Sequence, residues 1–166
     1  LLTDYSIQVG ADNAQLMDAD LSFTLRTYDA TSDNYEATIS GDVVSQNEDG
    51  QSFTKTTVIA NGDTTLDLKT FNLFLDGSVI DYAVLNRPFN FYSATQLSRV
   101  ASDPFVNNIP VPSIGTLVVI QGNAKGVAEI IQDPNDAHNT VLRVTTTDSN
   151  NVETVEIQSW CALLCC

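Results

Sequence analysis

Apolar and polar residues alternate with a period of two along most of the chain, which is the pattern of half-buried β-strands. In LSFTLRTY (21–28), the apolar residues Leu21, Phe23 and Leu25 share one face, and polar residues lie between them. The same pattern recurs in YEATI (35–39), FTKTTVI (53–59), TLDLKTFNLFL (65–75), SVIDYAVL (78–85), TLVVI (116–120), VAEII (127–131), TVLRVTT (140–146) and VETVEIQ (152–158). About nine short strands at this spacing predict an all-β fold, an antiparallel β-sandwich or jelly roll.

Turn-forming residues separate these segments. The turn compositions are DATSDN (29–34), NEDGQ (47–51), NGD (61–63), DG (76–77), DPNDAHN (133–139) and DSNN (148–151). ANGD (60–63), between two strand patterns, predicts a tight hairpin. The helix candidates are 11–20 and 93–102. We expect at most one short helix, over 93–102, where apolar residues recur every three or four positions.

The length of 166 residues suits a single domain, 1–166, with a core of its own. The segment 86–115 differs from the rest because it contains four of the five prolines. Pro110 and Pro112 would interrupt a strand ladder. The sequence therefore predicts a long, proline-containing connection at 86–115 and a separate Cys-rich terminal segment at 159–166.

The charge of the chain narrows the range of partners. The net charge is −14, from 21 acidic and 7 basic residues. Such a surface repels phosphate backbones and anionic lipids, so we expect no nucleic-acid partner. No apolar run approaches the roughly 20 residues that a membrane-spanning helix needs, so we expect no membrane span either.

The segment GNAKGVAEIIQDPNDAHNTVLRVTTTD (122–148) resembles the opening strands of concanavalin-A-like, laminin-G-type jelly rolls of secreted proteins. The resemblance implies a jelly roll and an extracellular or cell-surface setting, and it carries no catalytic residue. In that family the segment begins the domain, whereas here it comes late in the chain. A permuted jelly roll or strand exchange between subunits would reconcile the two orders.

Carboxylates and the single histidine are the candidates for catalysis. Glycoside hydrolysis needs two carboxylates that flank one bond, but Glu153 and Glu156 are three positions apart and would face opposite sides of a strand. His138 lies in the turn 133–139, where turn composition explains it without chemistry. We therefore expect no catalytic residues and a protein that is not an enzyme.

Acidic and amide side chains at turns are candidates for calcium, which prefers several oxygen ligands. The candidate ligands are Asn47 and Asp49, Asp18 and Asp20, and Asp29 and Asp33. None completes an EF-hand loop, and the same residue types are common in ordinary turns. Calcium is the one metal that these turns suggest, and no cofactor is required.

Aromatic residues are the candidates for binding a glycan, because sugar rings stack on them. Phe89, Phe91 and Tyr92 form the main aromatic cluster that we expect outside a strand, although a core role is the alternative.

The chain closes on SWCALLCC (159–166), which holds Trp160 and all three cysteines. An odd number of cysteines leaves at least one without a partner in the chain, and the spacing of Cys161, Cys165 and Cys166 matches no closed zinc module. An internal disulfide is disfavoured because Cys165 and Cys166 are adjacent and Cys161 lies close to both. Free thiols, bonds to another chain, and a last strand with buried cysteines stay open.

These features together predict a non-catalytic structural protein that is extracellular or lies at the cell surface. It would form a homo-oligomer or filament through sheet edges and the terminal segment. A carbohydrate-binding module, with calcium, is the alternative, and a polysaccharide-active enzyme is the third.

Overall fold

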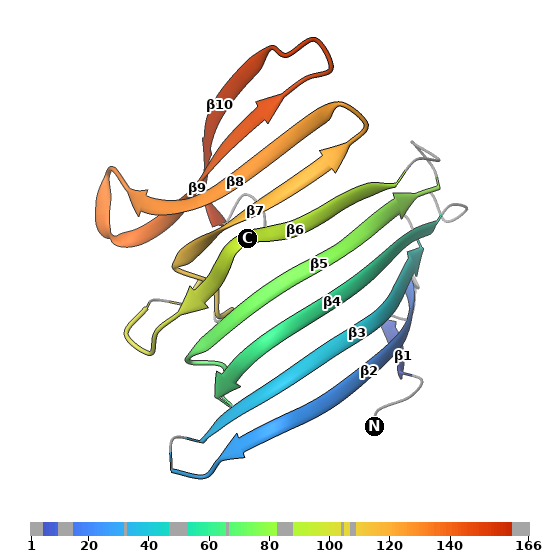
Figure 1. Cartoon of the computed structure of the whole chain (residues 1–166), viewed down its shortest axis with the longest axis vertical. Coiled ribbons are helices and arrows are strands. Elements are labelled where there is room, and N and C mark those ends of the chain that lie inside the picture. Colours follow the sequence, from blue (N-terminus) through green and yellow to red (C-terminus); the bar gives the residue numbers. More distant parts are fainter. Residues whose placement is uncertain are drawn as a thin grey trace.

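The computed structural model describes residues 5–9, 15–31, 33–46, 53–65, 67–82, 88–103, 105–106 and 109–160, with only the backbone described for 5–9, 15–19, 46, 53 and 137–138. Ten strands follow one another: β1 (Tyr5–Val9), β2 (Gln15–Asp29), β3 (Asn34–Gln46), β4 (Phe53–Thr65), β5 (Phe71–Asp81), β6 (Phe89–Arg99), β7 (Ile114–Gln121), β8 (Ala124–Asp133), β9 (Asp136–Thr147) and β10 (Glu153–Gln158). They form one antiparallel sheet in chain order (Figure 1). The predicted all-β, antiparallel class is confirmed, and the arrangement is consistent with a β-sandwich-like fold. Within the described residues no apolar helix reaches membrane-spanning length.

Several local predictions are wrong. The predicted helix over 93–102 is largely strand β6, and the other helix candidate, 11–20, runs into β2. The predicted hairpin at 60–63 lies inside β4, and the predicted turn at 76–77 lies inside β5. The long connection is also shorter than expected, because β6 occupies part of 86–115.

Strand register assigns each side chain to one of two faces of the sheet. Phe23 lies opposite Ile39, Ile39 opposite Ala60, and Ala60 opposite Leu75. Because residues directly opposite each other share a face, these four lie on one side of β2 to β5. We call this side the inner face and the other the outer face.

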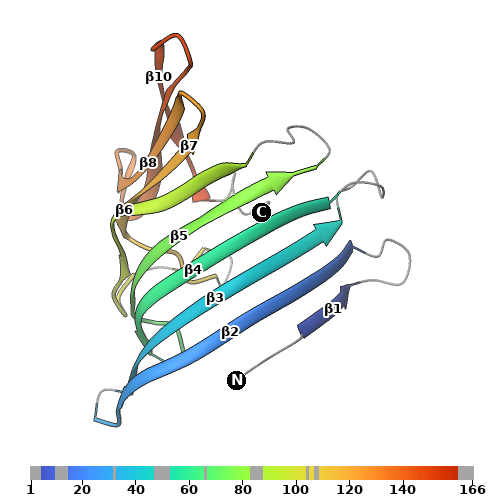
Figure 2. The same cartoon turned by 45° about the vertical axis from the view of Figure 1, so that its right-hand side comes forward.

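The main hydrophobic cluster lies on the inner face of the second half of the sheet, while the buried Val118 and Val141 fall in the outer-face register. Leu97 of β6, Ile130 of β8 and Leu142 of β9 are buried together, with Leu75, Ala128, Val144 and Trp160 packed against them. Since β6 and β9 are three strands apart, they would be separated by about 14 Å in a flat sheet. Their contact therefore requires the sheet to curl over its inner face. Figures 1 and 2 show β7 to β10 turned away from the broad array of β2 to β5.

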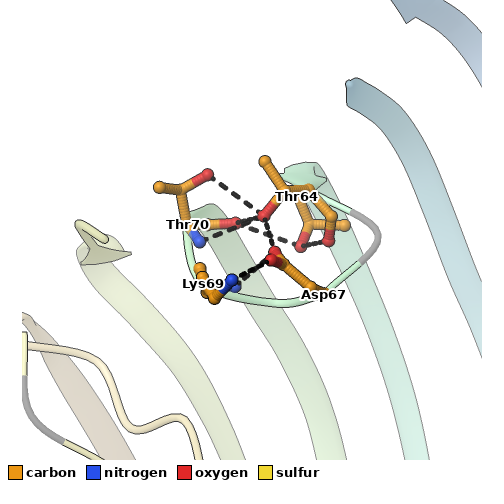
Figure 3. Close-up of polar contacts among 5 residues, drawn as sticks. Thr64, Asp67, Lys69 and Thr70 are labelled. Atoms are coloured by element: carbon orange, nitrogen blue, oxygen red, sulfur yellow. Dashed lines mark hydrogen bonds and ion pairs between the residues drawn. The ribbon is translucent and has the colours of Figure 1, made fainter. Parts of the chain in front are cut away.

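The β4–β5 hairpin turns around Asp67 rather than at 60–63 (Figure 3). Asp67 Oδ1 accepts hydrogen bonds from Thr65 Oγ1 at 2.9 Å and from the Lys69 amide at 3.1 Å. Lys69 Nζ lies 2.8 Å from Asp67 Oδ2. The Thr65 amide also donates to the Thr70 carbonyl at 3.0 Å, which closes the turn. A carboxylate acceptor at a turn of this kind holds the backbone donors that follow it.

Titration of Asp67 should report on this turn. The hydrogen bond from the Lys69 ammonium, aided by the Lys69 amide and Thr65, lowers the pKa of Asp67 from 3.8 to about 2. A lowered pKa in the folded state means that the turn gains stability above the unfolded pKa and loses it as the pH falls toward 2. In Lys69→Gln, the pKa of Asp67 should move up toward 3.8, measured by NMR of the carboxyl carbon. An Asp67 that titrates identically in Lys69→Gln would contradict this.

Candidate functional site

The inner face of β2 to β4 carries large apolar side chains that nothing in the described part of the chain covers. Phe23 is 40% exposed, Leu25 49% and Tyr28 51%, all on β2, and Ile39 on β3 is 39% exposed. The ring of Tyr28 stacks on that of Tyr35, with centroids 4.6 Å apart. Strand alternation places Phe23 and Leu25 on one side of β2, as the sequence predicts, and the register shift between Leu25 and Thr27 brings Tyr28 to the same side. That side is open rather than buried. We call this surface the β2–β4 inner face.

Charge is segregated between the two sides of these strands. The described inner-face residues are Leu21, Phe23, Leu25 and Tyr28 of β2, Tyr35, Ala37, Ile39, Gly41, Val43 and Ser45 of β3, and Thr54, Thr56, Val58, Ala60, Gly62 and Thr64 of β4. None of these described residues carries a charge. The acidic residues Asp20, Glu36, Asp42 and Asp63 fall in the outer-face register. Surfaces that are both apolar and free of charge are typical of buried interfaces.

The outer face is instead held by polar side chains that bridge neighbouring strands. Lys55 Nζ lies 2.7 Å from Asp42 Oδ2, and Thr57 Oγ1 donates to Asp42 Oδ1 at 2.6 Å. The Lys55 ammonium, aided by Thr57, lowers the pKa of Asp42. Thr38 Oγ1 donates to Asn61 Oδ1 at 2.8 Å. Cross-strand pairs of this kind stabilise a sheet that faces water.

A second feature is a cavity of about 320 Å³ between the 100–113 connection, β9 and Trp160. Arg99 lines it and is only 2% exposed. Its guanidinium donates to the Val111 carbonyl at 3.2 Å and to the Asp103 carbonyl at 2.6 Å, and lies 4.3 Å from the centre of the Phe105 ring. Asp103 Oδ2 in turn accepts from Ser113 Oγ at 2.5 Å. Arg99 therefore ties the connection between β6 and β7 to the sheet.

Among the predicted calcium ligands whose side chains are described, Asp20 lies apart from Asp29 and Asp33. Asp20 lies in the body of β2, whereas Asp29 and Asp33 lie at the turn after it. Asp29 Oδ1 accepts from the Thr31 amide, and Asp33 Oδ1 accepts from the Tyr28 hydroxyl at 3.2 Å. Asn47 and Asp49 lie outside the described residues, as does the side chain of Asp18. No cluster of three or more His, Cys, Asp or Glu side chains suited to a metal occurs among the described residues.

The predicted aromatic cluster is divided by strand alternation. Phe89, Phe91 and Tyr92 lie in β6 and not outside a strand, as the sequence suggested. Phe91 is half-buried on the inner face, where its ring lies over Gly77: a Cβ at Gly77 would come within 2.6 Å of Phe91 Cζ. Tyr92, opposite Asp76, is exposed on the outer face. Carbohydrate binding by this cluster stays a prediction.

The structure also places Trp160 of the terminal segment, the carboxylate pair Glu153 and Glu156, and the backbone of His138. Trp160 packs against the core and donates Nε1–H to Thr140 Oγ1 at 3.1 Å, while Cys161, Cys165 and Cys166 lie outside the described residues. Glu153 and Glu156 lie on opposite faces of β10. The backbone of His138 lies in β9, and its side chain is outside the described residues.

The comparisons with known proteins supply no relative. The chain matches no protein-family model. Comparison with curated proteins and with solved structures found no significant similarity. The resemblance of 122–148 to concanavalin-A-like jelly rolls therefore stays a prediction.

Proposed function

We propose that this protein is a non-catalytic structural subunit that assembles with copies of itself. The observation that carries the proposal is the β2–β4 inner face, whose described residues carry no charge and where Phe23, Leu25, Tyr28 and Ile39 are 39–51% exposed. The total surface area agrees with it. The chain exposes 10812 Å², whereas a compact monomer of its mass, 18.0 kDa, is expected to expose about 8,000 Å². This surplus of about 2,800 Å² per chain exceeds the roughly 800 Å² that each partner contributes to an interface of ordinary size.

The small core supports the same proposal. Among the described residues only seven apolar side chains are buried: Phe71, Leu97, Val111, Val118, Ile130, Val141 and Leu142. Six of these seven come from β6 or from the chain that follows it. The described residues of the long strands β2 to β4 contribute none, although β2 carries Leu21, Phe23 and Leu25 on one side. Burial against another surface would supply the stability that this half of the sheet lacks.

The ends of the sheet offer a second route to association. Among the described strands, β1 pairs with β2 only from Gln15 to Ala19. This edge of β2 is therefore open for another ten residues, to Asp29. At the other end, five of the six residues of β10 are exposed, with Val155 at 55% and Ile157 at 51%. Open edges can pair with strands of another chain, as the sequence analysis expects for a homo-oligomer or filament.

Two further parts of the proposal rest on the sequence. Glu153 and Glu156 point to opposite sides of β10, so they cannot flank one bond as a catalytic pair would. An extracellular or cell-surface location follows from the resemblance of 122–148 alone.

Sedimentation velocity of the purified chain tests the proposal. Over about a hundredfold range of concentration, we expect species larger than the monomer that increase with concentration. Association that persists in reducing agent supports contact through folded surfaces, whereas association lost on reduction supports assembly through the terminal cysteines. A monomer at every concentration, with and without reducing agent, would overturn the proposal.

A further inference from the structure

We infer that a second copy of this chain packs its β2–β4 inner face onto the β2–β4 inner face of the first, about a two-fold axis that runs along β3. This inference rests on the proposed self-assembly and names the surface and geometry that perform it. The pair would form a two-layer sandwich from two identical sheets, in which the sheets lie about 10 Å apart.

The absence of charged residues on the described inner face favours a second copy as its partner. Two chains that each carry a net charge of −14 repel one another, so a close contact requires surfaces on which no acidic groups face each other. The β2–β4 inner face meets this condition, because none of its described residues is charged. The open edges meet it less well: β2 carries Asp20 and Asp29 along its uncovered stretch, and β10 carries Glu153 and Glu156.

The sizes of the inner-face side chains are complementary under such an axis. Residues that lie opposite one another on β2, β3 and β4 form a row across the sheet. A two-fold axis along β3 places β2 of one copy over β4 of the other, and each row then faces the same row of the other copy. Phe23 shares a row with Ile39 and Ala60, so Phe23 would lie over Ala60 of the other copy. Leu25 shares a row with Gly62, so Leu25 would lie over Gly62 of the other copy.

Large side chains thus meet small ones in both rows, and each contact occurs twice. Interdigitation of large and small residues is what allows two sheets to reach the density of a protein interior. An isologous contact of this kind closes on itself, so it yields a dimer and not an open chain. It also leaves the acidic outer faces in contact with water on both sides of the sandwich.

A stable interface of ordinary size takes about 800 Å² from each partner, and obligate homodimers take more. The surplus of this chain, about 2,800 Å² relative to a compact monomer, is spread over the whole surface. The half-exposed Phe23, Leu25, Tyr28 and Ile39 place part of it on the β2–β4 inner face.

A pair of substitutions at neighbouring positions of β2 tests this interface. Leu25→Asp puts a carboxylate on the inner face, and Thr24→Asp puts the same group on the outer face one residue away. Both positions are exposed, so both variants should fold with the far-ultraviolet circular dichroism of the wild type. By sedimentation velocity, we expect Leu25→Asp to weaken self-association by roughly a hundredfold or more, because each dimer would bury two unpaired carboxylates. Thr24→Asp should associate like the wild type.

A size exchange tests the geometry itself. Phe23→Ala leaves a void over Ala60 of the partner copy, and Ala60→Phe sets two phenyl rings against each other, so each single variant should weaken association by about tenfold or more. The double variant, Phe23→Ala with Ala60→Phe, exchanges the two residues and should recover much of the lost affinity.

The outcomes separate the two proposals. If Leu25→Asp associates as tightly as Thr24→Asp, this interface is wrong while self-assembly stands. If association is lost in Leu25→Asp but the double variant shows no recovery, the face is right and the axis along β3 is wrong. If the wild type is a monomer throughout, both proposals fail.

Discussion

Gly41→Ala is expected to destabilise the protein by about 3 kcal/mol or more. Gly41 lies in the middle of β3 with φ of 150°, a conformation that side chains disfavour. A Cβ at this position would lie 1.9 Å from the carbonyl oxygen of Asp20. That oxygen belongs to the backbone of the paired strand, so no side-chain rotation relieves the clash, and β2 and β3 must separate locally.

Urea denaturation at one fixed protein concentration measures this effect, since association would otherwise shift the midpoint. The matched control is Gly126→Ala in β8, where the nearest atom to a new Cβ is Val119 Cβ at 3.9 Å. Gly126→Ala should lie within about 1 kcal/mol of the wild type, or be slightly more stable, because alanine restricts the unfolded chain. Equal midpoints for the two variants would show that β2 and β3 do not pair as described.

Arg99→Met is expected to cost about 3 kcal/mol, since hydrogen bonds to charged groups contribute about 1.5–3 kcal/mol each and their loss leaves buried acceptors unpaired. The substitution keeps an apolar chain of similar length but removes the donors to the Val111 and Asp103 carbonyls and the cation over Phe105. Because these contacts tie residues 100–113 to the sheet, we expect faster amide hydrogen exchange in that segment as well as a lower unfolding midpoint.

The control for Arg99 is the same substitution at an exposed arginine. Arg26 lies on the surface, and its guanidinium is 3.8 Å from the Glu36 carboxylate. Arg26→Met should change the free energy of unfolding by less than about 0.5 kcal/mol, because exposed ion pairs contribute little. If the two variants have the same midpoint, Arg99 does not anchor the connection.

The sequence predicts the strands well where alternation is regular and fails where other effects intervene. The period of two in 21–25 identifies both a strand and the residues that share its apolar face, but the register shift between Leu25 and Thr27 brings Tyr28 to that face against the period. In β6, register shifts between Ser93 and Thr95 and between Thr95 and Ser98 break the alternation. The bulges produce apolar spacings of three and four, which mimic a helix.

Turn signals were overridden where a strand has partners on both sides. Asn61 and Gly62 favour a hairpin locally, yet both lie inside β4. Asn61 accepts a hydrogen bond from Thr38 of β3, and its neighbour Asp63 accepts one from Asn72 of β5 at 3.0 Å. Pairing with two neighbours over the whole length of β4 outweighs a local preference of this size.

The candidate surface was only half predictable. Alternation places Phe23 and Leu25 on one side of β2, but whether that side is covered depends on how distant strands fold over it. The curl that brings Leu97 against Leu142 covers the inner face only from β5 onward. Arg99 gave no signal at all, because its buried role depends on carbonyls in a connection whose path the sequence does not reveal.

The order of the strands has a consequence for how the chain reaches this structure. Each strand pairs with the strands immediately before and after it in the sequence, so most partners are brought together by closing a short loop. Loop closure of this kind costs little entropy and favours rapid folding for a β-protein. The sheet can therefore grow strand by strand while a ribosome is still synthesising the chain, and only the curl of β7 to β10 over β6 must wait for the later residues.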